Sequence, residues 1–112
     1  MRAIAKAALV LPLAALLFAT AADARGPSFS CRGNLNRPER LICNDSELAQ
    51  LDLRVSQLYR KLGGPRGADE DVRDYVRDAL ARRNDCTSAR CIRRILRDEI
   101  DYLSNTDSDS GY

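Results

Sequence analysis

Hydrophobic residues recur along residues 44–62 with the spacing of an amphipathic helix. They stand at alternating intervals of three and four positions, at Leu48, Leu51, Val55, Leu58 and Leu62. Because an α-helix turns once in about 3.6 residues, this spacing places all of them on one stripe. Asn44 precedes Glu47 by three positions, the pattern of a capping box, and Gly63-Gly64-Pro65 interrupts the helix at its other end. The sequence therefore predicts a helix over 44–62 whose apolar stripe must pack against other elements.

Two later segments carry matching apolar faces. The first begins at the acidic residues 69–71, which favour the positive end of a helix dipole, and runs to about Arg83. The second begins after Thr87 or Ser88, either of which can cap a helix. The apolar positions are Val72, Tyr75, Val76, Ala79 and Leu80 in the first segment and Ile92, Ile95, Leu96, Ile100 and Leu103 in the second.

A short helical turn is expected over residues 36–43. Asn36 can cap it, and Pro38 falls in its first turn, where no amide donor is needed. No segment of the chain shows the alternating pattern of a strand. The sequence therefore predicts an all-α fold, a small antiparallel bundle of three main helices plus one short N-terminal helix.

Residues 1–24 have the features of a signal peptide. Arg2 and Lys6 precede an apolar run at 7–18, and Ala22-Asp23-Ala24 is a small-residue cleavage pattern, with 19–21 as a competing site. The apolar run is short for a transmembrane helix, so we expect no stable membrane anchor and a periplasmic or secreted protein. The helical domain would then cover 25–103, and the polar residues 104–112 are expected to form a disordered tail.

Four cysteines in an exported chain are expected to form disulfides that staple the bundle. Three pairings are possible, and we favour Cys31–Cys43 with Cys86–Cys91 because each cysteine then lies at a helix boundary near its partner. In one continuous helix the Cα atoms of the last two would be roughly 8 Å apart, too far for a bridge, but a break at residues 87–88 removes that obstacle. A zinc site is the alternative, although the chain lacks a C-x-x-C pair and exported thiols oxidise.

The charge and composition of the chain argue against several classes of function. The chain has 18 basic and 16 acidic residues, a net charge of +2, and only 5% aromatic residues, which is unlike a nucleic-acid-binding protein. It contains no histidine, the commonest general base and metal ligand, and no glycine-rich phosphate loop. We therefore expect a protein that is not an enzyme, with no catalytic residues, no metal and no cofactor.

Two charged clusters are candidates for contact with a partner. The acidic cluster consists of Asp69, Glu70 and Asp71. The densest basic region contains Arg82, Arg83, Arg90, Arg93, Arg94 and Arg97, and its candidate contacts, which we call the basic cluster, are Arg90, Arg93 and Arg94. Each cluster also has a simpler explanation: the acids support a helix N-terminus, and the arginines form a solvated helix surface.

Several motifs of the chain resemble a known family. Residues 38–43 read Pro-Glu-Arg-Leu-Ile-Cys and are followed by Asp45-Ser-Glu-Leu48, Leu51-Asp52 and Tyr59; residues 80–86 read Leu-Ala-Arg-Arg-Asn-Asp-Cys, with a four-residue gap to Cys91. Over about residues 30–103 these motifs resemble the lysozyme inhibitor LprI-like family of bacterial envelope proteins. This chain has Ala79 and Leu96 where members usually carry tryptophan and tyrosine.

The resemblance implies a small, exported, all-helical, disulfide-bonded protein, and lysozyme inhibition is attributed to a member of the family. We expect such an inhibitor to block the glycan cleft sterically and to offer carboxylates to a strongly basic enzyme. The alternative is a non-inhibitory envelope scaffold that binds a periplasmic protein or an anionic polymer through its arginine-rich C-terminal hairpin.

Overall fold

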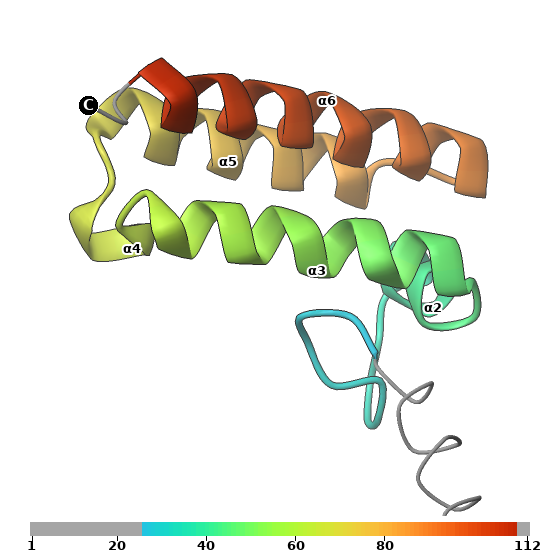
Figure 1. Cartoon of the computed structure of the whole chain (residues 1–112). Helices are drawn as coiled ribbons and strands as arrows, with labels where there is room; N and C mark the ends of the chain where they lie inside the picture. Colours follow the sequence, from blue (N-terminus) through green and yellow to red (C-terminus); the bar gives the residue numbers. More distant parts are fainter. Residues whose placement is uncertain (1–25, 110–112) are drawn as a thin grey trace, which may run out of the picture.

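The computed structural model describes residues 26–109, which fold into helices joined by short connections (Figure 1). The helices are α2 (Arg37–Cys43), α3 (Ser46–Lys61), α4 (Gly64–Gly67), α5 (Glu70–Asn84) and α6 (Ala89–Asp109). The predicted all-α bundle of three main helices and one short N-terminal helix is therefore confirmed. The single turn α4 was not predicted, and the expected signal peptide at 1–24 lies outside the described residues.

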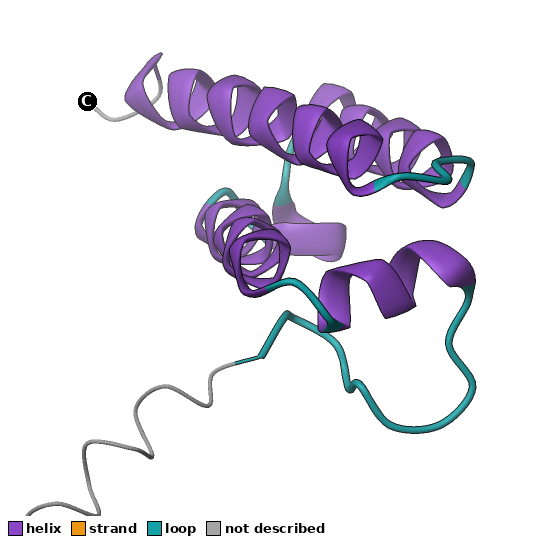
Figure 2. Cartoon of the chain, turned by 90° about the vertical axis from the view of Figure 1, so that its right-hand side faces the viewer, coloured by secondary structure: helices purple, strands orange, loops and turns teal. Residues whose placement is uncertain are grey.

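The three long helices lie side by side. The chain passes along α3, turns through α4, returns along α5 and reverses again into α6, so α5 runs antiparallel to both neighbours (Figure 1). α6 makes its most extensive contacts with α3, and α2 lies at one end of the bundle against α3, α5 and α6 (Figure 2). None of the helices in the described part of the chain combines the length and the apolar character needed to cross a membrane.

The apolar stripes meet in one core. Its largest fully buried side chains are Ile42, Leu48, Ile92, Leu96 and Leu103, from α2, α3 and α6. Removing an aliphatic side chain of this size from water contributes about 1.5–3 kcal/mol to folding. The stripe predicted for α3 is therefore confirmed, with Leu51 and Leu62 half-buried at its edges.

The start of α3 differs from the prediction by one residue. Asp45 is the N-cap, and its Oδ1 accepts hydrogen bonds from the amides of Glu47 at 3.0 Å and Leu48 at 3.2 Å. Asn44 instead closes the C-terminus of α2, because that helix continues to Cys43. The capping box predicted at Asn44 is therefore wrong.

A capping box does occur at α2. Asn36 Oδ1 accepts from the Glu39 amide at 2.8 Å, while Glu39 Oε1 accepts from the Asn36 amide at 2.8 Å. Pro38 lies in the first turn, as predicted. These reciprocal bonds satisfy two amides that would otherwise lack partners, which explains how a helix of seven residues begins sharply.

The glycine turn and the C-terminal end are both more ordered than expected. Gly63 has a φ of 117°, and a Cβ there would overlap the backbone of residues 67–68, so α3 ends at this point and α4 follows. α6 continues to Asp109, where Lys61 Nζ reaches Asp107 Oδ2 at 3.1 Å. The tail expected to be disordered from Ser104 is therefore helical over 104–109, where the ion pair to Lys61 and a hydrogen bond from Thr106 Oγ1 to the Tyr102 carbonyl hold it to the rest of the structure. Residues 110–112 lie outside the description.

The favoured disulfide pairing is confirmed. Cys31 is bonded to Cys43 with a Cα–Cα distance of 5.8 Å, and Cys86 to Cys91 with 5.6 Å. The first bridge fastens the N-terminal lead-in, residues 26–36, to the end of α2. The second fastens the corner between α5 and α6, where the helices are interrupted as the spacing required.

Candidate functional site

The acidic cluster lies at the exposed start of α5. Asp69 is the N-cap position, although its side chain makes no capping hydrogen bond, and Glu70 and Asp71 form the first turn. The expected role at a helix N-terminus thus accounts for where all three lie. Only Asp71 also takes part in a larger surface feature.

That feature is a shallow groove of about 640 Å³ between α5 and α6, which we call the acidic tyrosine groove. Its carboxylates belong to Asp71, Asp74 and Asp78, spaced so that they share one face of α5. Its floor contains Tyr75 and Tyr102, whose rings are stacked with centroids 3.8 Å apart and planes inclined by 10°.

The groove is negative although the whole chain is nearly neutral. Arg77 Nη2 reaches Asp74 Oδ1 at 2.6 Å and neutralises one of the three carboxylates, while Asp71 and Asp78 are exposed without an ion pair among the described residues. Burial raises the pKa of Tyr75, so this phenol stays neutral beside them. The groove was not predicted from the sequence, although three aspartates at helical spacing around a tyrosine could have indicated it.

The basic cluster is divided between two roles. Arg93 Nε donates to Glu47 Oε1 at 2.9 Å, and Arg97 Nη2 donates to Glu47 Oε2 at 2.7 Å, which ties α6 to the start of α3. Arg90 and Arg94 are exposed and make no ion pair with the described residues. Of the three arginines singled out in the sequence, one therefore serves the fold and two remain available to solvent.

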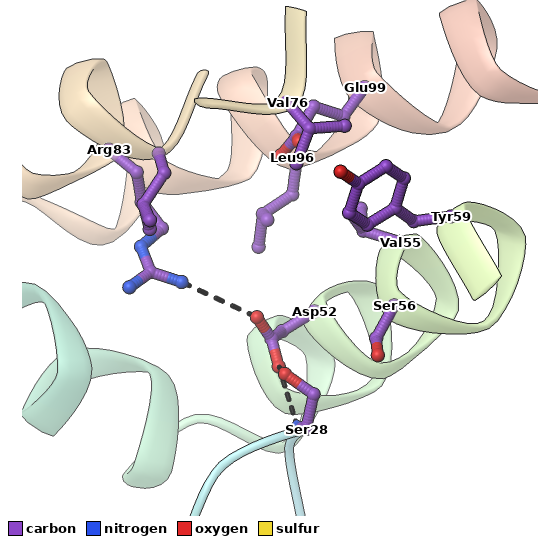
Figure 3. A pocket seen from close by; sticks show the side chains of 10 residues that line it. Ser28, Asp52, Val55, Ser56, Tyr59, Val76, Arg83, Leu96 and Glu99 are labelled. Carbon is purple, nitrogen blue, oxygen red and sulfur yellow. Dashed lines mark hydrogen bonds and ion pairs between the residues drawn. The ribbon is translucent and has the colours of Figure 1, made fainter. Parts of the chain in front are cut away.

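A cavity of about 180 Å³ lies between α3, α5, α6 and the N-terminal lead-in (Figure 3). It is lined by Ser28, Asp52, Val55, Ser56, Tyr59, Val76, Leu80, Arg83, Leu96 and Glu99. Three of these side chains, Asp52, Arg83 and Glu99, are charged residues that are only 5%, 8% and 5% exposed. We call this feature the charged cavity.

Asp52 joins three parts of the chain. Its Oδ1 accepts from Arg83 Nη1 at 3.4 Å, and its Oδ2 accepts from both the amide and the hydroxyl of Ser28, at 2.7 and 2.6 Å. The hydrogen bonds from Ser28 hold the lead-in over α3, where the Cys31–Cys43 bridge already restrains it. Asp52 is therefore fully occupied by partners of its own chain.

The guanidinium of Arg83 is only partly satisfied. Beside its contact with Asp52, Nη2 reaches Asn84 Oδ1 at 3.4 Å, and the Phe29 ring centroid lies 5.8 Å from Cζ. Nε is buried and has no hydrogen-bond partner. A buried donor without a hydrogen bond costs free energy, so the burial of Arg83 offsets part of the stability that its contact with Asp52 contributes.

Glu99 makes no hydrogen bond or ion pair with the described residues. Burial raises its pKa to about 7; the positive charges of Arg83 and Arg82 oppose this shift, and the negative charge of Asp52 adds to it. The charged cavity thus contains a carboxyl group that changes its charge near neutral pH.

The burial of these three charged residues was not predicted from the sequence. Asp52 stands four positions after Leu48 and three before Val55, and Glu99 stands three after Leu96 and four before Leu103. A charged residue at such a spacing falls on the apolar stripe of its own helix, so it must be buried when the stripe packs. That signal was present and could have identified both carboxylates.

Within residues 26–109 no group of three or more histidine, cysteine, aspartate or glutamate side chains is arranged to hold a metal ion. A scan against protein-family models finds none that matches the chain, and searches of curated proteins and of solved structures return no match either.

Proposed function

We propose that this protein is an exported inhibitor that binds lysozyme and blocks its glycan cleft, with the acidic tyrosine groove as its contact surface. The observation that carries the proposal is the gathering of Asp71, Asp74 and Asp78 around the stacked pair of Tyr75 and Tyr102. Carboxylates complement a strongly basic partner, and tyrosines are enriched among the residues that anchor protein interfaces. The near-neutral net charge matters less than this local concentration of negative charge.

Two further features support the proposal. The disulfides restrain the lead-in and the α5–α6 corner, so the groove is presented by a rigid body that loses little conformational entropy on binding. The same bridges, together with the signal-peptide features of residues 1–24, support a periplasmic or secreted location. The motif resemblance to the LprI-like family is what suggests lysozyme as the particular basic partner.

The experiment measures the lysis of bacterial cell walls by lysozyme in the presence of the purified, oxidised protein. We expect the lytic rate to fall as the protein is added, and we expect Asp71→Asn/Asp78→Asn to lose at least tenfold in inhibitory potency. Glu70→Gln/Asp85→Asn is the matched control, because it removes the same charge from exposed positions outside the groove. An unchanged rate at excess wild-type protein contradicts the proposal, and equal losses in both variants contradict the groove as the contact surface.

The exposed Arg90 and Arg94 favour a second candidate, an envelope scaffold that binds an anionic polymer through the C-terminal hairpin. Retention on a polyphosphate resin should fall in Arg90→Glu/Arg94→Glu and stay unchanged in Arg54→Glu/Arg60→Glu, which reverses two exposed charges on α3. Equal retention of both variants would exclude the hairpin as the binding surface.

A further inference from the structure

We propose that the charged cavity is a binding site for a primary ammonium group on a short apolar stem, with Glu99 as its counter-ion. The proposal concerns the cavity between α3, α5 and α6 and does not depend on lysozyme inhibition. The cavity is separate from the acidic tyrosine groove, and no sequence motif predicts a ligand for it.

The charges of the cavity call for a cation. Among the lining residues, two carboxylates, Asp52 and Glu99, face one guanidinium, that of Arg83, which is hydrogen-bonded to Asp52. Arg82 is exposed and lies outside the lining, so it acts on Glu99 through its charge alone. Asp52 is further satisfied by Ser28, so the unmatched charge belongs to Glu99, which is 5% exposed and has no hydrogen bond or ion pair within residues 26–109. An ionised carboxylate in such a place is unfavourable until a cation pairs with it.

An anion does not fit the same space. Arg83 donates from Nη1 to Asp52 and from Nη2 to Asn84, and its Nε is buried. An anion entering the cavity would meet two carboxylates and would have to compete with Asp52 for the single guanidinium of the lining. The lining of the cavity therefore favours a positively charged ligand.

An ammonium suits the cavity better than a guanidinium does. Glu99 offers two acceptor oxygens, and Tyr59 reaches across the cavity with its hydroxyl directed towards Leu96 and Glu99 (Figure 3). These few acceptors match the three donors of a compact ammonium group, whereas a planar guanidinium brings five donors in a fixed fork.

The remaining wall is apolar and fits a hydrocarbon stem. Val55, Val76 and Leu96 line the interior, and Leu80, which is 45% exposed, places a large apolar side chain at the surface beside it. An apolar cavity of roughly 150 Å³ is enough to hold benzene. A volume of about 180 Å³ therefore admits a ligand of similar size, such as n-butylamine.

Two sources can supply this chemistry: a free alkylamine, or the lysine side chain of a protein partner. The probes are n-butylamine for the first and Nα-acetyl-lysine methylamide for the second. Each is titrated into the oxidised protein at about pH 8 while methyl and carboxyl NMR signals of the cavity residues are followed. n-Butanol is the uncharged control, because it matches the shape of n-butylamine without its charge.

We expect saturable shifts of the methyl signals of Val55, Val76 and Leu96 with n-butylamine, and at least tenfold weaker binding of n-butanol. Glu99→Gln should lose at least tenfold in amine affinity, while Glu70→Gln, an exposed position on α5, should bind like the wild type. If the lysine derivative binds as well as butylamine, the site accepts a partner's lysine; if butylamine alone binds, the site is for small amines.

The pH dependence tests the same site without a variant. Glu99 is faced by Asp52 and Tyr59 from α3 and by Arg82 and Arg83 from α5, and burial raises the pKa of its carboxyl to about 7. An alkylammonium keeps its charge throughout, so its affinity should fall about tenfold for each pH unit below 7.

Three results would overturn the proposal. They are the absence of a saturable shift with either amine, equal binding of n-butanol and n-butylamine, and an amine affinity that Glu99→Gln leaves unchanged. The first two comparisons use the wild-type protein, so they remain decisive even if the variant folds poorly.

Discussion

Replacing Glu99 with glutamine should change how the stability of the protein depends on pH. Burial raises the pKa of this carboxyl from 4.5 to about 7 in the folded protein. Each pKa unit corresponds to about 1.4 kcal/mol, so the shift is equivalent to roughly 3 kcal/mol of folding free energy. Because Glu99 is almost fully buried, solvent screening reduces this value little.

The sign of this pH dependence follows from whether the folded or the unfolded protein holds the Glu99 proton. Between pH 4.5 and 7 the folded protein keeps the Glu99 proton while the unfolded chain releases it. This group therefore lowers the free energy of unfolding as the pH rises through that window, and its effect stays constant above about pH 7. Glutamine stays neutral at every pH, so Glu99→Gln should gain stability relative to the wild type over the same window.

The assay is urea denaturation of the oxidised proteins from about pH 4 to about pH 8.5. The difference in unfolding free energy between Glu99→Gln and the wild type should grow with pH and level off above about pH 7, after a rise of roughly 3 kcal/mol. Taking the difference cancels the titration of the other groups. Glu70→Gln, exposed at the start of α5, is the control and should show no such rise. Parallel curves for Glu99→Gln and the wild type would refute the reasoning.

The remaining predictions concern the packing around this site and the turn after α3. Asp52→Ala leaves Arg83 buried without its carboxylate, so it should destabilise the protein by about 3–5 kcal/mol in urea denaturation, and a cost below about 1 kcal/mol would contradict the importance of the pair. Gly63→Ala forces a side chain onto a φ of 117° and against the backbone of Gly67 and Ala68, so it should cost more than about 1 kcal/mol and lower the thermal midpoint. Gly67→Ala, where a Cβ meets nothing within 4 Å, is the control for this turn and should not lower the midpoint comparably.

Much of the fold could be predicted because it depends on periodicity and on local stop signals. The stripe through Leu48, Val55 and Leu58 identifies α3 whatever its neighbours are, and the glycines at 63–64 end it. The disulfide pairing followed from the positions of the cysteines at helix boundaries. The N-cap of α3 was misplaced by one residue because Asn44 and Asp45 are both good caps, and only the length of α2 decides between them.

The candidate site was harder to predict because it depends on contacts between distant segments. Asp52 and Arg83 are 31 residues apart and become partners only when α3 and α5 have both packed against α6. The stacking of Tyr75 on Tyr102 likewise requires the α5–α6 hairpin to close. The helical end of α6 was missed for a similar reason, since the ion pair between Lys61 and Asp107 joins residues that are far apart in the chain.

The two bridges have a consequence for how the protein matures. Each cysteine is joined to the next one along the chain, over separations of 12 and 5 residues, and neither bridge encloses the other. A chain whose thiols oxidise in sequence order therefore reaches the native pairing without first forming a wrong bridge.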